Sequence, residues 1–275
     1  MSQDTVHYAS PEPTVSMTQK ELMNGNGRAV FGLGYVFIPR EVLNDFVASR
    51  FPYWDKTKAY VLTSPDMSHE TDWCWHIVYC EKGGGSQEPE SEAGVEGFLF
   101  VLGGQMLLKV GADKHELTEG GFAYMPPDTG WSVLNPSDDT LKFIWVRKLY
   151  QPVRGLKPKM LIGNEKEMHP PVHPSGTAKI LIPWAEDMAY DMSMAIVNFP
   201  PGNFIPFVET HVHQHGLYLL SGQGMYLVNE RWHEVRGGDY FWMHAWCPQA
   251  CYAGGVEPMR YLLYKNVNRQ FSMHR

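Results

Sequence analysis

The 275-residue sequence lacks the features that mark several common classes of protein. Its net charge is -7, so it has no basic excess for nucleic acid, and we expect no nucleic-acid partner. Its first thirty residues contain no apolar stretch of signal-peptide length. The run from Phe31 to Ile38 carries glycines and is too short to cross a membrane. We therefore predict a cytoplasmic protein with no membrane contact.

Cysteine is scarce, and long amphipathic helical patterns are few. The four cysteines, Cys74, Cys80, Cys247 and Cys251, lack the doublet spacing of a zinc ribbon. Buried, reduced thiols are the simplest interpretation for a cytosolic protein. What the sequence has in quantity is apolar and aromatic residues, 44% and 13% of the chain. That content predicts a substantial folded core and excludes a disordered chain.

Short runs of strand-forming residues, separated by glycine or proline, dominate from about residue 71 onward. The clearest are Trp73–Tyr79, Phe98–Leu102, Met106–Val110, Phe122–Met125, Trp131–Leu134, Leu141–Val146, Met192–Phe199, Gly216–Leu220, Met225–Val228, Tyr240–Met243 and Tyr261–Tyr264. Short strands at roughly ten-residue spacing are typical of a β-sandwich or β-barrel. The sequence therefore predicts an all-β fold.

Turn residues recur in register in the two halves of the chain. Glu96 is followed after six residues by Gly103, and His215 is followed after six residues by Gly222. A proline-rich passage between the halves interrupts the strand rhythm, as expected for a linker. We therefore predict a duplicated β-barrel, with a flexible leader at 1–27, an N-terminal barrel at 28–160 and a C-terminal barrel at 161–275.

Metal-binding side chains gather in one short stretch, from Glu209 to His215. In an extended strand, at about 3.3 Å per residue, His211 and His215 would lie about 13 Å apart, so a turn must bring them to one ion. We predict Glu209, His211 and His215 as ligands. His213 is excluded because it would lie with Gln214 at the tip of that turn. Three surface histidines are the alternative, but the apolar run directly after His215 argues against it.

This stretch resembles the first motif of the cupin superfamily, and more closely the pattern of the (S)-ureidoglycine aminohydrolase family. The matching segments are Glu209-x-His211-x3-His215-Gly216, Leu220-Ser221-Gly222-Gln223-Gly224-Met225-Tyr226, Gly238-Asp239-Tyr240, Gln249 and Tyr261-Leu262-Leu263-Tyr264-Lys265-Asn266-Val267-Asn268-Arg269. Relative to the general cupin motifs, Glu209 and His215 have exchanged chemical identity, and Gln249 replaces the last histidine. The resemblance runs from about residue 28 and implies a bicupin, two tandem jelly-roll β-barrels with an N-terminal extension.

The resemblance also implies a site. Its metal ligands would be Glu209, His211, His215 and Gln249; its catalytic residues Glu209, His211, His215 and Lys265; and its substrate contacts Tyr226, Tyr261 and Lys265. Asp191 is a further candidate, for the substrate amine. The family implies Mn²⁺, and Fe²⁺ or Zn²⁺ would suit the same donors. Lys265 would pair with the substrate carboxylate, a point-charge role that suits lysine.

The implied activity is that of a manganese-dependent hydrolase acting on a C–N bond. It would convert (S)-ureidoglycine to (S)-ureidoglycolate and ammonia in allantoin and purine catabolism. The expected partners are a small-molecule substrate and further copies of the chain in a homo-oligomer. In the first half, Glu90, Glu92, Glu96 and Ser132 match the ligand positions. Because no imidazole is among them, we expect no metal there and interpret the three carboxylates as solvated.

Two other functions stay open at this point. An iron-dependent cupin dioxygenase would use a carboxylate and two histidines, although Gln249 would fill a position that oxygen chemistry needs. A non-catalytic small-molecule-binding bicupin is the second alternative. Ligands retained in only one half argue against a pure storage role.

Overall fold

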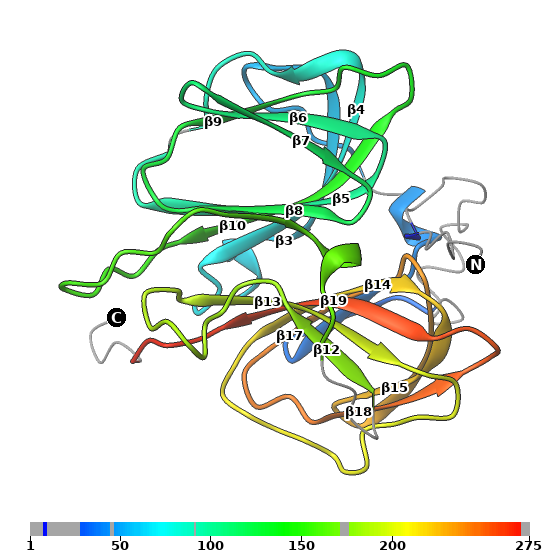
Figure 1. The fold of residues 1–275 in the computed structure, drawn as a ribbon. Helices are drawn as coiled ribbons and strands as arrows, with labels where there is room; N and C mark the ends of the chain where they lie inside the picture. Colours follow the sequence, from blue (N-terminus) through cyan, green and yellow to red (C-terminus); the bar gives the residue numbers. More distant parts are fainter. Residues whose placement is uncertain (1–7, 10–27, 45–46, 91, 171–175, 271–275) are drawn as a thin grey trace.

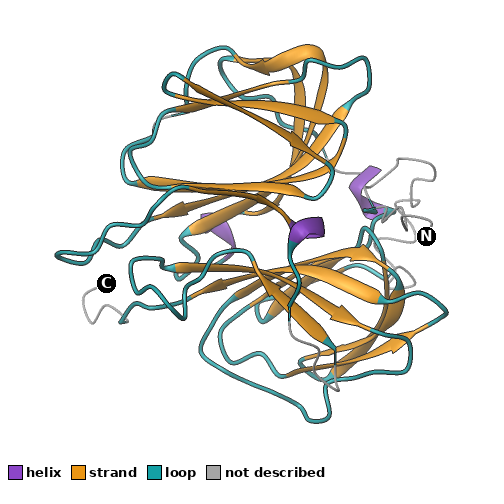
Figure 2. Ribbon diagram, in the orientation of Figure 1, coloured by secondary structure: helices purple, strands orange, loops and turns teal. Residues whose placement is uncertain are grey.

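The computed structural model describes residues 8–9, 28–44, 47–90, 92–170 and 176–270, and these form two β-barrels stacked on one another (Figure 1). Figure 2 shows that strands dominate the fold and that helix is confined to short turns. The 3-10 turns are η1 (Val42–Asn44), η2 (Pro65–Met67) and η3 (Glu165–Glu167). None of the described helices has the length and apolarity of a membrane span. The predicted leader lies outside the described residues, apart from Tyr8 and Ala9.

The N-terminal barrel is a nine-stranded antiparallel sheet with the order β11-β8-β5-β10-β4-β9-β6-β7, in which β3 also pairs with β4. Its strands are β3 (Trp54–Thr63), β4 (Trp73–Ser86), β5 (Val95–Gly103), β6 (Gln105–Val110), β7 (Asp113–Thr118), β8 (Gly121–Met125), β9 (Trp131–Leu134), β10 (Leu141–Leu149) and β11 (Leu161–Asn164). The predicted strand runs in this half are all present.

The C-terminal barrel is built from two sheets. The seven-stranded sheet has the order β1-β2-β17-β14-β19-β13-β12, and the three-stranded sheet has the order β16-β15-β18. The strands are β1 (Val30–Phe31), β2 (Tyr35–Ile38), β12 (Thr177–Ile180), β13 (Met192–Phe199), β14 (His215–Ser221), β15 (Gln223–Val228), β16 (Arg231–Arg236), β17 (Tyr240–Met243), β18 (Gln249–Gly254) and β19 (Met259–Asn266). The all-β, two-barrel prediction is confirmed.

Strand pairing crosses the predicted barrel boundaries at both ends. Strand β2 falls within the predicted N-terminal segment, but it pairs with β17 of the C-terminal sheet, with Phe37 opposite Phe241. Strand β11 falls within the predicted C-terminal segment, but it pairs with β8. By sheet membership, 35–38 therefore belong to the C-terminal barrel and 161–164 to the N-terminal one. Each strand lies far along the chain from its partner, so no local pattern indicated the exchange.

The two barrels share their largest hydrophobic cluster, which forms an inter-barrel interface. Alternate residues of β4, such as Trp73 and Trp75, join this cluster, whereas Val78 and Cys80 join the core inside the N-terminal barrel. The central strands are therefore buried on both faces. In Figure 1 the sheet with β5, β8 and β10 faces the sheet with β13, β14 and β19. Burial of each large side chain here contributes about 2 kcal/mol, which couples the stability of the two barrels.

The duplicated register is visible in the strand pairs. Gly97 pairs with Arg147 as His215 pairs with Lys265. The N-terminal position equivalent to His215 is therefore Gly97, and Glu96 faces the opposite side of the strand. Glu96 is fully buried at the inter-barrel interface, so the interpretation of it as a solvated carboxylate is wrong.

The fourth predicted N-terminal position is corrected by the same register. Trp131 forms an isolated antiparallel β-bridge with Glu90, and Gln249 forms one with Glu209. Trp131, and not Ser132, is therefore the counterpart of Gln249.

The four cysteines are free thiols, and Cys80 and Cys251 are buried.

Candidate metal and substrate site

The residues before β14 turn sharply and bring two imidazoles together. The ring centroids of His211 and His215 are 4.6 Å apart, far closer than an extended strand would allow. The bend lies at Val212, and His215 begins β14. The predicted turn between the two histidines is therefore confirmed. Gln214, predicted to lie with His213 at the tip of that turn, is buried, with 3% of its surface exposed.

Gln249 approaches the imidazoles from the other sheet. Two backbone hydrogen bonds of 2.9 Å pair Glu209 with Gln249 and fix the two residues opposite one another. The Gln249 amide Nε2 lies 3.3 Å from His215 Nε2, and its Oε1 accepts a 3.0 Å hydrogen bond from the Tyr226 hydroxyl. For Oε1 to be a metal ligand the amide must turn over, after which Nε2 would donate to the Tyr226 oxygen.

The electrostatics of the site favour neutral imidazoles beside a carboxyl group and an ammonium. Burial lowers the pKa of His211 to about 4, and it lowers the pKa of His215 well below its ordinary value. Burial raises the pKa of Glu209, an effect that the nearby Lys265 opposes. Burial lowers the pKa of Lys265, and Glu209 opposes that effect. Unprotonated imidazole nitrogen is the form that binds a metal ion.

The geometry and the chemistry of the described donor groups together decide whether they fit a cation. Among them, no three or more histidine, cysteine, aspartate or glutamate side chains already stand in a metal-binding arrangement. His211 Nδ1, however, is buried and has no hydrogen-bond partner among the described groups. A buried ring nitrogen without a partner is costly unless something binds it. Two imidazoles, a carboxylate and an amide oxygen suit a divalent cation, so the chemistry of the predicted donors fits one.

The last strand lines the same interior. Tyr261 and Leu263 belong to the core inside the C-terminal barrel, and Lys265 follows on the same face of β19. The ring centroids of Tyr226 and Tyr261 are 6.1 Å apart, at an edge-on angle of 70°. Lys265 pairs with both His215 and Ser193 across the sheet. The structure therefore brings together the predicted residues on β14, β15, β18 and β19.

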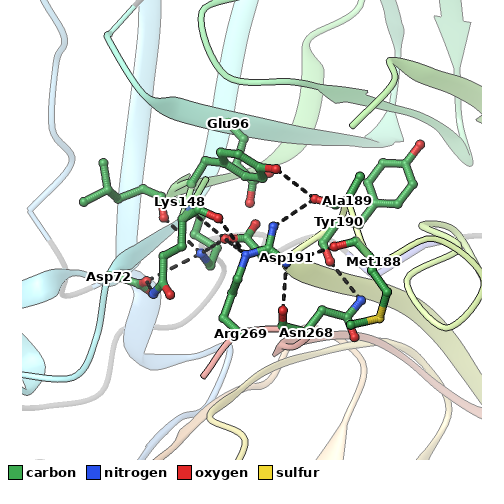
Figure 3. A network of polar contacts seen from close by, with 12 residues as sticks. Asp72, Glu96, Lys148, Met188, Ala189, Tyr190, Asp191, Asn268 and Arg269 are labelled. Atoms are coloured by element: carbon green, nitrogen blue, oxygen red, sulfur yellow. Dashed lines mark hydrogen bonds and ion pairs between the residues drawn. The ribbon is translucent and has the colours of Figure 1, made fainter. Parts of the chain in front are cut away.

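Asp191 lies elsewhere, in a buried polar network between the barrels (Figure 3). Its Oδ2 accepts a 2.7 Å hydrogen bond from Lys148 Nζ and a 2.8 Å hydrogen bond from the backbone of Gln151. Burial would lower the pKa of Lys148, but the Asp191 carboxylate raises it. Burial and Asp191 together raise the pKa of Glu96. Oδ2 of Asp191 is thus paired at the inter-barrel interface, whereas its Oδ1 is buried with no hydrogen-bond partner among the described residues. A contact of Asp191 with the substrate amine stays a prediction.

His213 is the third imidazole of the stretch and lines a cavity next to the network around Asp191. Its ring centroid is 5.2 Å from that of His211. It lines a cavity of about 70 Å³ together with Lys148, Asp191 and Arg269. The exclusion of His213 as a ligand stays a prediction, and its position beside the polar network is consistent with that exclusion.

The fold and the internal repeat define the class of this protein. The model of the cupin domain matches residues 65–147 and 195–264, one copy in each barrel. A crystal structure of oxalate decarboxylase superposes with a TM-score of 0.65 at 12% identity over 88% of this chain and 79% of that one, a likeness of fold alone. A provisionally named glyoxylate-induced protein from Pseudomonas aeruginosa superposes with a TM-score of 0.87 at 37% identity, over 97% of this chain and 98% of that one.

Within the cupins, the sequence comparisons point to one group. The chain is 31% identical to the (S)-ureidoglycine aminohydrolase of Escherichia coli K12, over 81% of this chain and 85% of that protein. It is 29% identical to the (S)-ureidoglycine aminohydrolase of Arabidopsis thaliana, over 96% of this chain and 86% of that protein. The chain therefore belongs to the (S)-ureidoglycine aminohydrolase family of bicupins.

Proposed function

We propose that this chain is a metal-dependent aminohydrolase that converts (S)-ureidoglycine to (S)-ureidoglycolate and ammonia, in the cytoplasm and as a homo-oligomer. One observation carries the proposal: His211, His215 and Gln249 converge inside the C-terminal barrel. They do so in a chain that is similar to proteins named (S)-ureidoglycine aminohydrolase. Glu209, His211, His215 and Gln249 would hold the cation, for which we propose Mn²⁺, with Fe²⁺ and Zn²⁺ as alternatives.

When bound, such a cation lowers the pKa of a coordinated water and orients the substrate amine. The protein side chains would then divide the remaining work. Lys265, half-buried on β19, would pair with the substrate carboxylate, because a desolvated ammonium strongly favours an anionic partner. The hydroxyls of Tyr226 and Tyr261 would hydrogen-bond the ureido group, and both lie in the barrel interior.

The net reaction exchanges the substrate amine for a hydroxyl group from water. The bond between carbon and the amine nitrogen breaks, and the nitrogen leaves as ammonia after gaining a proton. Glu209, His211 and His215 would take part in this reaction by holding the cation, and Lys265 by holding the substrate carboxylate. The network around Asp191 lies outside this set of residues.

The test is ammonia release from freshly generated (S)-ureidoglycine. Protein stripped with a chelator should be inactive, and Mn²⁺ should restore ammonia release together with stoichiometric ureidoglycolate. Fe²⁺ and Zn²⁺, added separately, rank the alternative metals. Ammonia release by the stripped protein at the full rate would remove the metal from the proposal. Mn²⁺-loaded protein that releases no ammonia would leave a metal-binding cupin that acts on another substrate.

A further inference from the structure

The N-terminal barrel, for which no metal is predicted, reaches the loop that carries the predicted ligands. The contact is made by Gln214, which stands between His213 and His215 and is almost fully buried. Its Oε1 accepts a 3.0 Å hydrogen bond from the Thr71 hydroxyl and a 3.3 Å hydrogen bond from the Trp73 indole N–H. An indole nitrogen can only donate, so the contact with Trp73 fixes which end of the amide faces the N-terminal barrel.

A second contact holds the backbone of the same residue. The Gln214 N–H donates a 2.8 Å hydrogen bond to Oδ1 of Asn266, the residue that follows Lys265 on β19. Gln214 is therefore held on its side chain by one barrel and on its backbone by the other. The Thr71 hydroxyl is itself hydrogen-bonded to Ser68 at 2.9 Å, which orients it.

The next residue on the interface side of β14 is Gly216, and the aromatic rings of β4 leave it no room for a side chain. A Cβ there would lie 2.7 Å from the ring of Trp73 and 2.9 Å from the ring of Trp75. The Trp73 ring also packs on Tyr264, with centroids 4.2 Å apart. Both neighbours of His215 in the chain, and the residue before Lys265, thus contact the N-terminal barrel.

We propose that Thr71, Trp73 and Gln214 are positioning residues, through which the N-terminal barrel fixes His215 and the ligand loop for cation binding. The residues alternate along β14, so Gln214 and Gly216 face the other barrel while His215 faces the site. A loop held at Gln214 loses little further freedom when the cation binds, which strengthens binding. Groups that orient metal ligands typically change metal affinity about 10- to 100-fold when removed. The inference rests on the proposed function for the identity of the cation.

The structure supplies matched controls for the test. Trp75 lies two residues from Trp73 in the same interface, but its indole N–H is buried with no partner among the described residues. Thr63 is a fully buried hydroxyl that bonds Tyr240 at 2.5 Å, on the strand before β4. The variants Trp75→Phe and Thr63→Val remove an indole or a hydroxyl from the same interface, as Trp73→Phe and Thr71→Val do, but they leave both side-chain hydrogen bonds of Gln214 in place.

Two readouts separate positioning from general stability. Mn²⁺ affinity, measured by titration calorimetry, should fall about tenfold in Thr71→Val and in Trp73→Phe. It should stay within about twofold of wild type in both controls, and Thr71→Ser should restore it. In the metal-free protein, hydrogen exchange at the backbone amides of 211–215 should be about tenfold faster in the two test variants than in the controls.

Equal Mn²⁺ affinity and equal exchange in test and control variants would overturn the inference. So would a loss that follows only the melting temperature of the metal-free protein, since that indicates a structural role. Failure of the proposed function has a different signature, because wild-type protein would then bind no Mn²⁺ or release no ammonia. In that case the exchange comparison alone decides whether the N-terminal barrel orders the loop.

Discussion

Gly97 and Arg147 face one another in the N-terminal barrel where His215 and Lys265 face one another in the C-terminal barrel. The backbone register is the same, and only the side chains differ. In one barrel the arginine is paired with Glu92. In the other, the lysine lies opposite His215, whose imidazole is buried. Because the two barrels share this backbone register, the proposed site depends on the side chains that the register carries, above all on the imidazole of His215.

The interiors differ in how they are filled. Trp145 stacks on Trp54, with ring centroids 5.3 Å apart, and meets Trp131 edge-on at 5.5 Å. The positions equivalent to Trp145 and Trp131 hold Leu263 and Gln249 in the C-terminal barrel. Three tryptophans pack together in the first interior, whereas smaller side chains occupy the positions of two of them in the second. We therefore expect the N-terminal barrel to act as a packed support for the site in the C-terminal barrel, and four experiments test that division of roles.

The largest effect is expected when the carboxylates at equivalent positions of the two barrels, Glu209 and Glu90, are compared. Glu209→Ala should abolish metal binding and lower the rate of ammonia release about 1000-fold or more, because a bound cation contributes several kcal/mol of transition-state stabilisation. Glu90→Ala, at the equivalent bridge, should keep both metal and activity. Metal content by mass spectrometry and initial rates check the pair. Equal losses in the two variants would break the comparison.

The second prediction concerns the cluster of Trp54, Trp131 and Trp145 inside the N-terminal barrel. Trp145→Ala should lower the free energy of unfolding by about 4 kcal/mol, because it opens a large cavity among buried aromatic rings. Stoichiometric Mn²⁺ binding should persist in the fraction that remains folded. Urea unfolding and metal titration at low temperature provide the measurements. A variant with wild-type stability would show that the N-terminal interior is not a packed support.

The third prediction concerns His76, a neutral buried imidazole inside the N-terminal barrel. Burial lowers its pKa to about 4, whereas the unfolded chain has the ordinary value near 6.5. Below pH 6.5 the unfolded state binds a proton that the folded state does not, so stability falls as the pH drops toward 4. The loss amounts to about 3 kcal/mol for this shift.

His76→Phe should reduce the slope of unfolding free energy against pH between 6.5 and 4.5. Its ring would keep the edge-on contact with Phe51, at 5.5 Å between centroids in the wild type. Urea titrations at several pH values measure the slope. An unchanged slope would mean that the acid sensitivity comes from other groups and that His76 is not its source.

The smallest of the four effects is expected when the basic side chains at equivalent positions, Lys265 and Arg147, are compared. Lys265→Ala should retain Mn²⁺ but lower kcat/KM about 100-fold, mainly through KM, because the substrate carboxylate loses a desolvated charge partner. Arg147→Ala, at the equivalent position, should change kcat/KM less than about twofold. Steady-state ammonia release measures both. Full activity in Lys265→Ala would remove the carboxylate assignment and leave the metal site intact.

Local sequence by itself determined the strand rhythm, the duplication and the chemistry of the 209–215 stretch. It also indicated that Tyr261, Leu263 and Lys265 share a face, since alternation along a strand is a local property. The turn that joins His211 and His215 followed from distance alone. These inferences needed only periodicity and reach, which the chain carries residue by residue.

Only the tertiary structure decided what lies between the barrels. It placed β2 in the C-terminal sheet, buried Glu96 beside Asp191, and set Gln214 against Thr71 and Trp73. The partners of these contacts are separated by many residues, and their side chains are of ordinary types at their own positions. Pairing over such separations depends on how two finished sheets pack, so it has no signature in either segment alone.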